Sequence, residues 1–326
     1  MKQYFKIVGS ARYLPRKCIH AEELDRRSGL EAGWTLKHTG VRVRHEAGPD
    51  ESGTEMARRV VMDALKSAGF GLRDLDLLID ASLCLQQPIP SNSALILESL
   101  GREAAGCATM DVHSSCLGFV AALQTVNGLF AAEGYDRAVI VCGETPLRGV
   151  NWDEPESAHL MGDGAAAIVL ERCSPRDGCA FRFQTFAEGA QLCRVEGGCH
   201  RLPPAAYASS NRARYEFHMD GKGVHRFASQ HLPAMVAEAV AASGTPLSDL
   251  HVVPHQASGP SIELLTRRLG IGRSRVHSSV EHHGNMVAAG IPFVLHGARA
   301  ELAEGVRVML VGTAAGYSQA VAIFTL

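Results

Sequence analysis

Three residues in this sequence combine a reactive or polar side chain with the expected end of a secondary structure element. Cys116 stands between ATMDVHSS and the apolar stretch CLGFVAALQTVNGLF, where we predict that a strand gives way to a helix. A thiol in the first turn of a helix feels the positive end of the helix dipole, which favours the nucleophilic thiolate. His255 ends a predicted strand in VVPHQAS, and Asn285 opens a predicted helix in HHGNMVAAGIP. Cysteine and histidine form a common nucleophile pair, and a neutral histidine with an asparagine can donate hydrogen bonds to a carbonyl oxygen that gains negative charge.

Each of these residues also has a structural interpretation, because a thiol in an apolar context is usually a buried, inert group. The sequence alone leaves both interpretations of Cys116 open, and for the other eight cysteines we predict the structural role. Taken singly, His255 and Asn285 are also more often structural. Their places at matching junctions of the chain favour the functional interpretation.

The elements that must hold these residues recur along the chain. The tetrapeptide VHSS occurs at Val112–Ser115 and again at Val276–Ser279, and LRDLDLLIDAS resembles LSDLHVVPHQA. Each VHSS precedes an apolar helical stretch, then an acidic residue with glycine, and then an apolar strand. We therefore predict a duplication into an N-terminal half, 1–173, and a C-terminal half, 174–326. A pseudo-twofold axis between such halves would bring the starts of two equivalent helices face to face.

Apolar runs of strand length alternate with helical patterns, which predicts an α/β protein with largely buried sheets. The predicted strands are Leu75–Ala81, Ala138–Cys142, Val252–Pro254 and Val306–Gly312, and the predicted helices are Thr54–Ala68, Cys116–Glu133, Phe227–Ala242 and Met286–Ala303. The stretch 183–223 is rich in Gly, Pro, Ala and Arg and is too long for an ordinary connection. We expect this insertion to cap a site or to lie at an interface.

The overall composition excludes several classes of function. Of the 326 residues, 46% are hydrophobic and the net charge is −2, which predicts a sizeable core and no general attraction to nucleic acid or anionic membranes. No apolar run reaches the ~18–20 residues that a membrane span needs. Nine cysteines without a recognisable signal peptide predict free thiols in the cytoplasm.

Other kinds of site have weaker signals. Zinc ligands are conceivable in three groups, namely Cys173 with Cys179, Cys193 with Cys199 and His200, and His282 with His283. The chain has no C-x-x-C pair and no H-E-x-x-H helix, so we predict no metal site. It also lacks the G-x-S-x-G elbow of serine hydrolases. We interpret GDG at Gly162–Gly164 as a tight turn and not as a dinucleotide fingerprint.

Over nearly its whole length the chain resembles the thiolase-fold ketosynthases, and within them the β-ketoacyl-acyl-carrier-protein synthase III family. The matching motifs are WTLKHTGVRVRH, PIPSNSALILESLG, MDVHSSCLGF, MGDGAAAIVL, VVPHQAS, HHGNMVAAGIP and the closing GTAAGYSQAVAIFTL. The resemblance implies two pseudo-duplicated βαβαβ halves in a layered α-β-α-β-α core.

The resemblance also implies a catalytic triad of Cys116, His255 and Asn285. In such enzymes the cysteine takes an acyl group from a thioester. The other two residues then hold a malonyl-type thioester, whose decarboxylation gives an enolate that attacks the acyl-cysteine. The backbone amides of Cys116 and of Ala315–Gly316 would hold the oxyanion, and no metal or redox cofactor is needed.

Several positions that would bind substrate depart from the family pattern. The tryptophan is kept as Trp34, but His38 replaces the usual arginine and WDEPESAHLMGDG lacks the arginine expected to stack on adenine. Pro260 stands where a basic residue often contacts the carrier protein, and Ile89 stands where an aromatic residue gates the acyl tunnel. Further residues implied in substrate binding are Gly221 and Ser258.

These departures indicate a specialised enzyme, acting in polyketide or fatty-acid-derived metabolism on acyl-carrier-protein or coenzyme A thioesters. The family also implies a homodimer in which the Gln87–Ser91 loop reaches the partner's tunnel. Two alternatives stay open. One is an acyltransferase that forms an ester, amide or thioester without decarboxylation, and the other is a non-catalytic partner subunit.

Overall fold

Two β-sheets lie at the centre of the structure, a computed structural model that describes residues 1–326. The first sheet has the strand order β1-β7-β6-β4-β5 and the second has the order β11-β12-β13-β8. The bounds of the first sheet are β1 Gln3–Tyr13, β4 Leu77–Asp80, β5 Ala108–Asp111, β6 Arg137–Glu144 and β7 Gly164–Arg176. Those of the second are β8 Ala180–Thr185, β11 His251–Pro254, β12 Arg307–Ala314 and β13 Ser318–Thr325.

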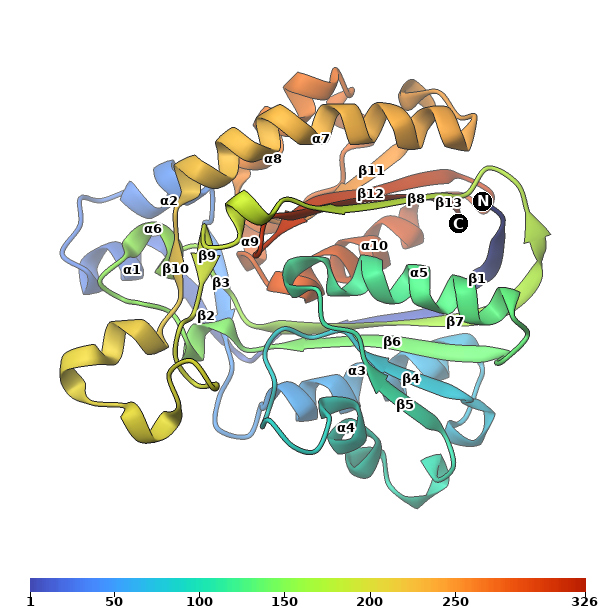
Figure 1. The fold of residues 1–326 in the computed structure, drawn as a ribbon, viewed down its shortest axis with the longest axis horizontal. Helices are drawn as coiled ribbons and strands as arrows, with labels where there is room; N and C mark the ends of the chain where they lie inside the picture. Colours follow the sequence, from blue (N-terminus) through green and yellow to red (C-terminus); the bar gives the residue numbers. More distant parts are fainter.

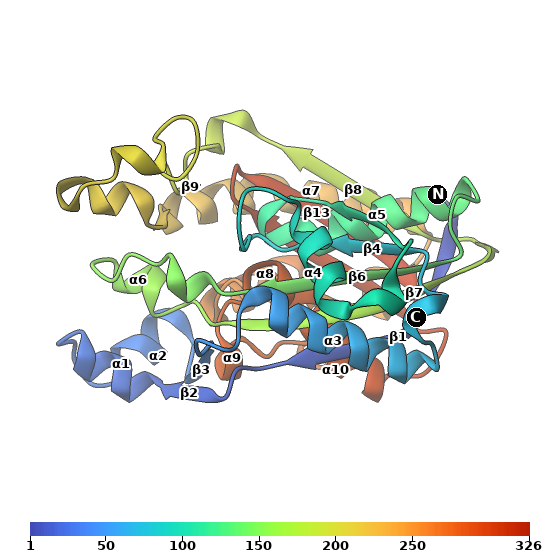
Figure 2. The ribbon, with the colours of Figure 1, turned by 90° about the horizontal axis from the view of Figure 1, so that it is seen from below.

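Helices cover both sheets and separate them from each other (Figure 1). Helices α3 (Gly53–Ala68) and α4 (Asn92–Leu100) pack on the outer face of the first sheet, as the view from below shows (Figure 2). Helices α5 (Gly118–Ala131) and α10 (Gly290–Glu301) fill the space between the sheets. Helices α7 (Gly221–Ser243) and α8 (Gly259–Leu269) cover the second sheet. Every residue of β4 is buried, and all but the terminal Asp80 are apolar, because both faces of the sheet meet helices.

The two halves repeat one topology, which confirms the predicted thiolase-type α-β-α-β-α arrangement. In the first half β4 runs parallel to β6, which pairs antiparallel with β7, which in turn pairs antiparallel with β1. In the second half β11, β12, β13 and β8 repeat these relationships in the same order. The boundary proposed at residue 173 falls inside β7, which continues to Arg176.

The VHSS tetrapeptides themselves are not equivalent in space. The pairings of β4 with β6 and of β11 with β12 make Leu78 equivalent to Val252. Leu78 pairs with Thr109, whereas Val252 pairs with Val276, so Val276 corresponds to Thr109 and not to Val112. The duplication is therefore real in topology, but the repeated tetrapeptide lies out of register between the halves.

The predicted strands all exist, and the predicted helices differ mainly at their starts. Helix α7 begins at Gly221, six residues before the expected Phe227. The helices predicted from Cys116 and from Met286 begin later, at Gly118 and at Gly290. Short 3-10 turns precede both, η3 (Ser115–Leu117) and η10 (Val287–Ala289). Each opens on a residue with φ of 48°, Ser115 or Val287, so the matching turns reproduce one backbone shape.

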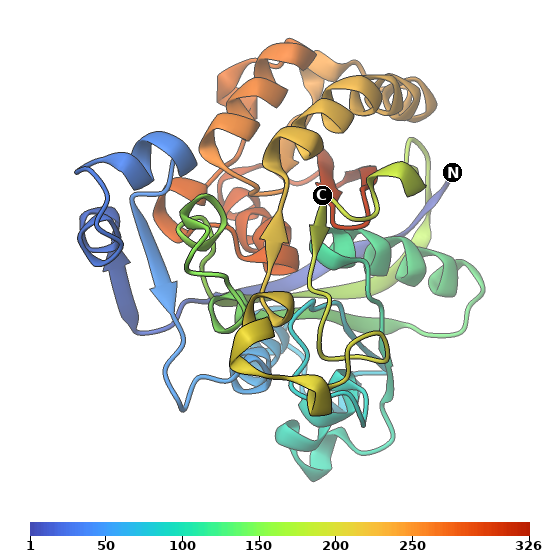
Figure 3. The same cartoon turned by 60° about the vertical axis from the view of Figure 1, so that its left-hand side comes forward.

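The insertion and the N-terminal helices lie at the same end of the molecule, on the left in Figure 1, and this end comes forward in Figure 3. Its longest regular piece is the 3-10 segment η7 (Ser209–Tyr215), and a two-stranded ribbon joins β9 (Cys193–Arg194) to β10 (His218–Met219). The remaining elements are β2 Lys17–His20, α1 Ala21–Arg27, α2 Trp34–Thr39, β3 Val43–Glu46, α6 Pro155–Ala158 and α9 Val280–His283.

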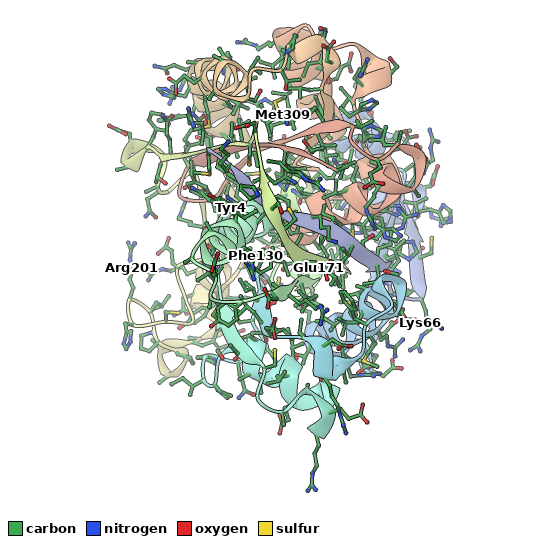
Figure 4. The ribbon with its side chains drawn as sticks, turned by 90° about the vertical axis from the view of Figure 1, so that its right-hand side faces the viewer. Tyr4, Lys66, Phe130, Glu171, Arg201 and Met309 are labelled. Carbon is green, nitrogen blue, oxygen red and sulfur yellow. The ribbon has the colours of Figure 1, made fainter.

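The opposite side of the molecule shows the layers end-on (Figure 4). Lys66 lies on α3 in one outer layer, Phe130 on α5 in the middle, and Met309 in the second sheet. Phe130 is almost fully buried, and Tyr4 of β1 packs against the same central cluster. No helix combines the length and the apolar character that crossing a membrane requires.

Candidate active site

Cys116, His255 and Asn285 line one cavity of about 880 Å³. Of the ten residues predicted to form the site, the same cavity is also lined by His38, Gly221, Ser258 and Ala315. Trp34, Ile89 and Gly316 do not line it. The insertion closes one side of the cavity through Cys193, Val195, Phe217 and Met219.

Turn η3 holds Cys116 between the two halves. Ser115, just before it, has a positive φ, which bends the chain sharply out of β5. Gly118, just after it, packs so closely that an added Cβ would lie 2.2 Å from the carbonyl oxygen of Ala81 and 3.6 Å from the Cβ of Ala288. Ala288 belongs to η10, so the two equivalent turns meet face to face as the duplication predicted.

The protonation state of Cys116 differs from the expectation. Burial raises the pKa of the Cys116 thiol to about 12, and charge on Cys193 and Glu144 acts in the same direction. The backbone amides of Ala315 and Cys116 lower this pKa, but less strongly. The predicted thiolate at the start of a helix is therefore wrong for the free protein. Cys116 precedes α5 and packs beside an apolar cluster, so desolvation outweighs the helix dipole.

His255 is fixed at the end of β11 by close contact with β12. Its backbone N–H donates to the carbonyl of Val311 at 2.8 Å. The neighbouring Gly312 leaves room for the imidazole, because a Cβ at that position would lie 2.6 Å from the Cβ of His255. Burial lowers the pKa of His255 to about 4, so the ring is neutral at pH 7. Its buried Nδ1 has no hydrogen-bond partner in the free protein.

The second VHSS tetrapeptide, Val276–Ser279, holds a buried glutamine and does not lead into a nucleophile as the first one does. The fully buried Gln256 lies next to His255, and its Oε1 accepts hydrogen bonds from the Ser278 hydroxyl and from the amides of Ser279 and Val280. Its Nε2 donates to the carbonyl of Pro254 at 2.7 Å. Gln256 therefore ties the strand that carries His255 to the loop that leads to Asn285.

Asn285 is held by the segment that the sequence suggested to be a simple turn. Its amide donates to the carbonyl of Leu160 at 2.9 Å, and its carbonyl accepts from the amide of Gly162 at 3.1 Å. Gly162 permits this approach, since a Cβ there would lie 2.1 Å from the carbonyl oxygen of His283. The interpretation of GDG as a tight turn is wrong, because Met161 forms a bridge to Asn285 and Gly164 already opens β7.

The Asn285 side chain is oriented by its own turn. Its Oδ1 accepts from the amide of Val287 at 2.9 Å, and its Nδ2 donates to the carbonyl of Ala257 at 3.4 Å. The second N–H of Nδ2 is left to donate to a ligand in the cavity. A neutral imidazole and this amide can both donate to one carbonyl oxygen, which is the arrangement needed to stabilise negative charge there.

Some of the predicted substrate-binding residues line the cavity and others do not. His38 lines the cavity and stacks on Trp34 with ring centroids 4.2 Å apart, while its Nδ1 donates to the Trp34 carbonyl. Ser258 also lines the cavity, but its hydroxyl caps α8 by accepting from the amide of Ser261. Ile89 is 84% exposed, away from the cavity of its own chain.

Several cavity residues were not found from the sequence. The lining includes two cysteines besides Cys116 and four charged or ionisable side chains, namely Cys84, Cys193, Arg148, Glu156, Lys222 and His225. Their positions in the sequence carry no shared motif, so only the fold brings them together. No group of three or more His, Cys, Asp or Glu side chains is arranged to hold a metal ion.

A half-buried thiol, a neutral imidazole and an amide that share one cavity on this fold define a thiolase-fold acyl-condensing enzyme. The profile of the 3-oxoacyl-(acyl-carrier-protein) synthase III family matches residues 110–189, and the profile of its C-terminal part matches residues 240–326. The chain belongs to this family, which places it among the acyltransferases.

Individual relatives match along almost the whole chain. The chain is 31% identical over 325 residues to the acetoacetyl CoA synthase NphT7 of Streptomyces sp. strain CL190, covering 98% of each protein. It is 29% identical to a β-ketoacyl-(acyl-carrier-protein) synthase III of Neisseria meningitidis, covering 97% of each. The crystal structure of 3-oxoacyl-(acyl carrier protein) synthase III from Pseudomonas aeruginosa PAO1 superimposes with a TM-score of 0.87 at 28% identity, covering 99% of this chain and 98% of that one.

Proposed function

We propose that this protein condenses an acyl group held on Cys116 with a malonyl-type thioester. The observation that carries the proposal is that Cys116, His255 and Asn285 line the same cavity. Similar proteins named for acetoacetyl-CoA or β-ketoacyl-carrier-protein synthesis support it.

The first step transfers the acyl group to the enzyme. Because the Cys116 pKa is about 12, the thiol must lose its proton as it reacts, and the neutral imidazole of His255 is the base that lines the same cavity. The sulfur then attacks the thioester carbonyl, the amides of Cys116 and Ala315 stabilise the oxyanion, and the donor thiol leaves with the proton. Gly316 has a φ of 80°, a backbone conformation suited to turning the amides of this loop toward the sulfur.

The second step forms the carbon–carbon bond. His255 and Asn285 donate to the carbonyl of the malonyl-type thioester, whose carboxylate leaves as CO2 and whose electron pair becomes an enolate. The enolate carbon attacks the acyl carbonyl on Cys116, the C–S bond breaks, and Cys116 regains a proton. The products are CO2 and a β-ketoacyl thioester, so atoms and charge balance with thioesters and protons alone, and we propose that the enzyme uses no metal or redox cofactor.

We propose that the acyl donor is a carrier-protein thioester rather than a coenzyme A thioester. Glu156 lines the cavity in the stretch where the family pattern expects an arginine against adenine, and a carboxylate there would repel the phosphates of coenzyme A. His38, an imidazole in place of an arginine, lies against Trp34. These changes support a specialised role in polyketide or fatty-acid-derived metabolism.

We also propose that the protein acts as a homodimer. Strand β5 is the edge of the first sheet, and the carboxylate of Asp111 at its end accepts from the amides of Asn92 and Ser93. This contact anchors a loop that exposes Leu85 and Ile89. Exposed apolar side chains beside the free edge of a sheet are typical of an interface. We therefore expect the Gln87–Ser91 loop to reach a partner's cavity.

A reducing compartment such as the cytoplasm is proposed as the site of action, since all nine cysteines are free thiols. A non-catalytic partner subunit is the less favoured function, because such a subunit would have no need to keep all three polar groups in one cavity.

The test of the proposed function is product analysis with an acyl thioester and malonyl-carrier protein. We expect CO2 and a β-ketoacyl product in equal amounts, and none from C116A. N285A should still become acylated but should not condense, whereas H255A, which removes the proposed base as well as a donor, should be slowed in acylation and should not condense. Transfer of the acyl group to an alcohol, amine or thiol without CO2 would instead establish the simple acyltransferase, and no acylation at all would establish the non-catalytic subunit.

A further inference from the structure

A second cavity, of about 100 Å³, lies between α7 and α8 and adjoins the first. The two cavities share six lining residues, namely Val224, His225, His255, Ala257, Ser261 and Thr313. Beyond these the wall of the second cavity is mainly apolar, with Leu232, Leu264, Leu265, Leu269 and Val311. His255 therefore borders both spaces.

A proline inside α7 helps to form this hollow. Pro233 lacks an N–H, so the carbonyl of Ser229 loses its usual partner within the helix, and Arg268 of α8 donates to that carbonyl at 3.4 Å. Nearer the first cavity, His225 Nε2 and the Ser261 hydroxyl are 3.1 Å apart. The helices are thus linked at two points and leave the apolar space between them.

We propose that this second cavity receives an alkyl substituent on the α-carbon of the malonyl-type thioester. The inference rests on the proposed function, in which His255 and Asn285 hold the carbonyl of that thioester. The α-carbon is bonded directly to this carbonyl, so any substituent on it starts beside His255, which borders the second cavity. Decarboxylation then gives an α-substituted enolate, which forms the same C–C bond and breaks the same C–S bond as the unsubstituted one.

The size of the cavity limits the substituent. A cavity of about 150 Å³ lined by apolar side chains accepts benzene, so a cavity of this size is expected to hold roughly four carbons. Its leucine-rich wall favours hydrocarbon over polar groups, by roughly fourfold in affinity for each buried methylene. We expect methyl, ethyl and butyl groups to fit, and hexyl not to fit.

The experiment compares malonyl, methylmalonyl, ethylmalonyl, butylmalonyl and hexylmalonyl thioesters on one carrier protein with one acyl primer. In the unaltered protein, kcat/KM should hold or rise as far as butyl and fall at least tenfold at hexyl. Ala228 lines only the second cavity, so Ala228→Leu should lower kcat/KM for ethylmalonyl and butylmalonyl at least tenfold and leave malonyl within about twofold. Ala234→Leu, on the exposed face of the same helix, is the control and should change neither.

The outcomes separate the two proposals. Turnover of malonyl with rejection of every substituted extender would overturn this inference and leave the proposed function intact. Failure with malonyl as well would overturn the proposed function itself. Ser229→Val is a second, smaller filling variant, checked for folding by its melting temperature. Equal losses for malonyl and ethylmalonyl in both filling variants, or a response only to the length of the acyl primer, would also overturn the inference.

Discussion

Gly312 leaves the space that the His255 side chain needs, since a Cβ built on Gly312 would lie 2.6 Å from the Cβ of His255. Real Cβ atoms do not approach so closely. Gly312 belongs to β12, and His255 directly follows β11, which pairs with β12, so the two residues cannot easily separate. The position of the imidazole thus depends on the absence of a single methyl group in the neighbouring strand.

Gly312→Ala should therefore displace His255 and lower kcat for condensation. A displacement of about 1 Å can cost roughly a hundredfold in rate. Gly128→Ala in α5 is the matched control, because nothing lies within 4 Å of a Cβ at that site. It should retain activity and stabilise the protein by roughly 0.5–1 kcal/mol. Unchanged turnover in Gly312→Ala, with the fold intact, would show that the placement of His255 is not critical.

The protonation state of Cys116 predicts its reactivity toward alkylating agents. Its pKa is raised to about 12, first by burial, so at neutral pH the thiol form dominates. Because only the thiolate reacts, the rate of alkylation by iodoacetamide should increase roughly tenfold per pH unit from pH 7 to 10 without levelling off. The measurement is mass spectrometry of the Cys116 peptide, with the exposed Cys18 as an internal reference for the reagent. A plateau below pH 9 would mean that the free enzyme already holds a thiolate.

A buried chain of hydrogen bonds supports the Trp34–His38 pair. The Thr35 hydroxyl donates to Asp25 at 2.5 Å and so must accept from His159 Nδ1 at 2.8 Å. Burial lowers the pKa of His159 to about 4, which keeps this ring neutral with its proton on Nδ1.

Thr35→Val removes the centre of this chain and leaves His159 Nδ1 without a partner, whereas Asp25 keeps its bonds from the amides of Gly33 and Thr35. It should lower the free energy of unfolding by roughly 1–3 kcal/mol. Because His38 lines the cavity and stacks on Trp34, KM for the donor thioester should rise while kcat stays within twofold. Thr125→Val on α5 is the control, since the Thr125 hydroxyl bonds only to the carbonyl of Ala121. A fall in kcat with KM unchanged would place the network in the chemical step instead.

Gln256 couples His255 to the loop before Asn285, so Gln256→Ala tests how the two donors are held together. Loss of its buried hydrogen bonds to Ser278, Ser279 and Val280 should lower the free energy of unfolding by roughly 2–4 kcal/mol. Condensation should fall further than acylation of Cys116, because only condensation uses both donors. Gln191→Ala, at an exposed position, should change neither. Stability equal to that of the unaltered protein, measured by urea unfolding, would contradict the linking role.

The sequence was informative where local patterns carry the structure. The patterns around Cys116 and His255 predicted the ends of two strands, the apolar stretch after Asn285 predicted the start of a helix, and the repeated topology predicted that these junctions meet. These signals are local because a buried strand and the turn that follows it are specified by adjacent residues.

Other features depend on contacts between distant segments and could not be predicted. Burial of the Cys116 sulfur arises from neighbours such as Leu147 and Val287, which no local pattern connects with the helix start. The hydrogen bond from the Gly162 amide to the Asn285 carbonyl could likewise not be predicted from the sequence, because each segment by itself is typical of a turn. The non-equivalence of the two VHSS copies follows from the registers of the strands, which the identical sequences of the copies do not reveal.

The central claim is that Cys116 carries the acyl group, and mass spectrometry of the intact protein tests it most directly. Because Cys84 and Cys193 line the same cavity, the labelled peptide must be identified after digestion. Incubation with an acyl thioester and no malonyl-type partner should add one acyl mass, located on Cys116, and C116A should add none. An acyl group found on Cys84 or Cys193, or retained by C116A, would contradict the account.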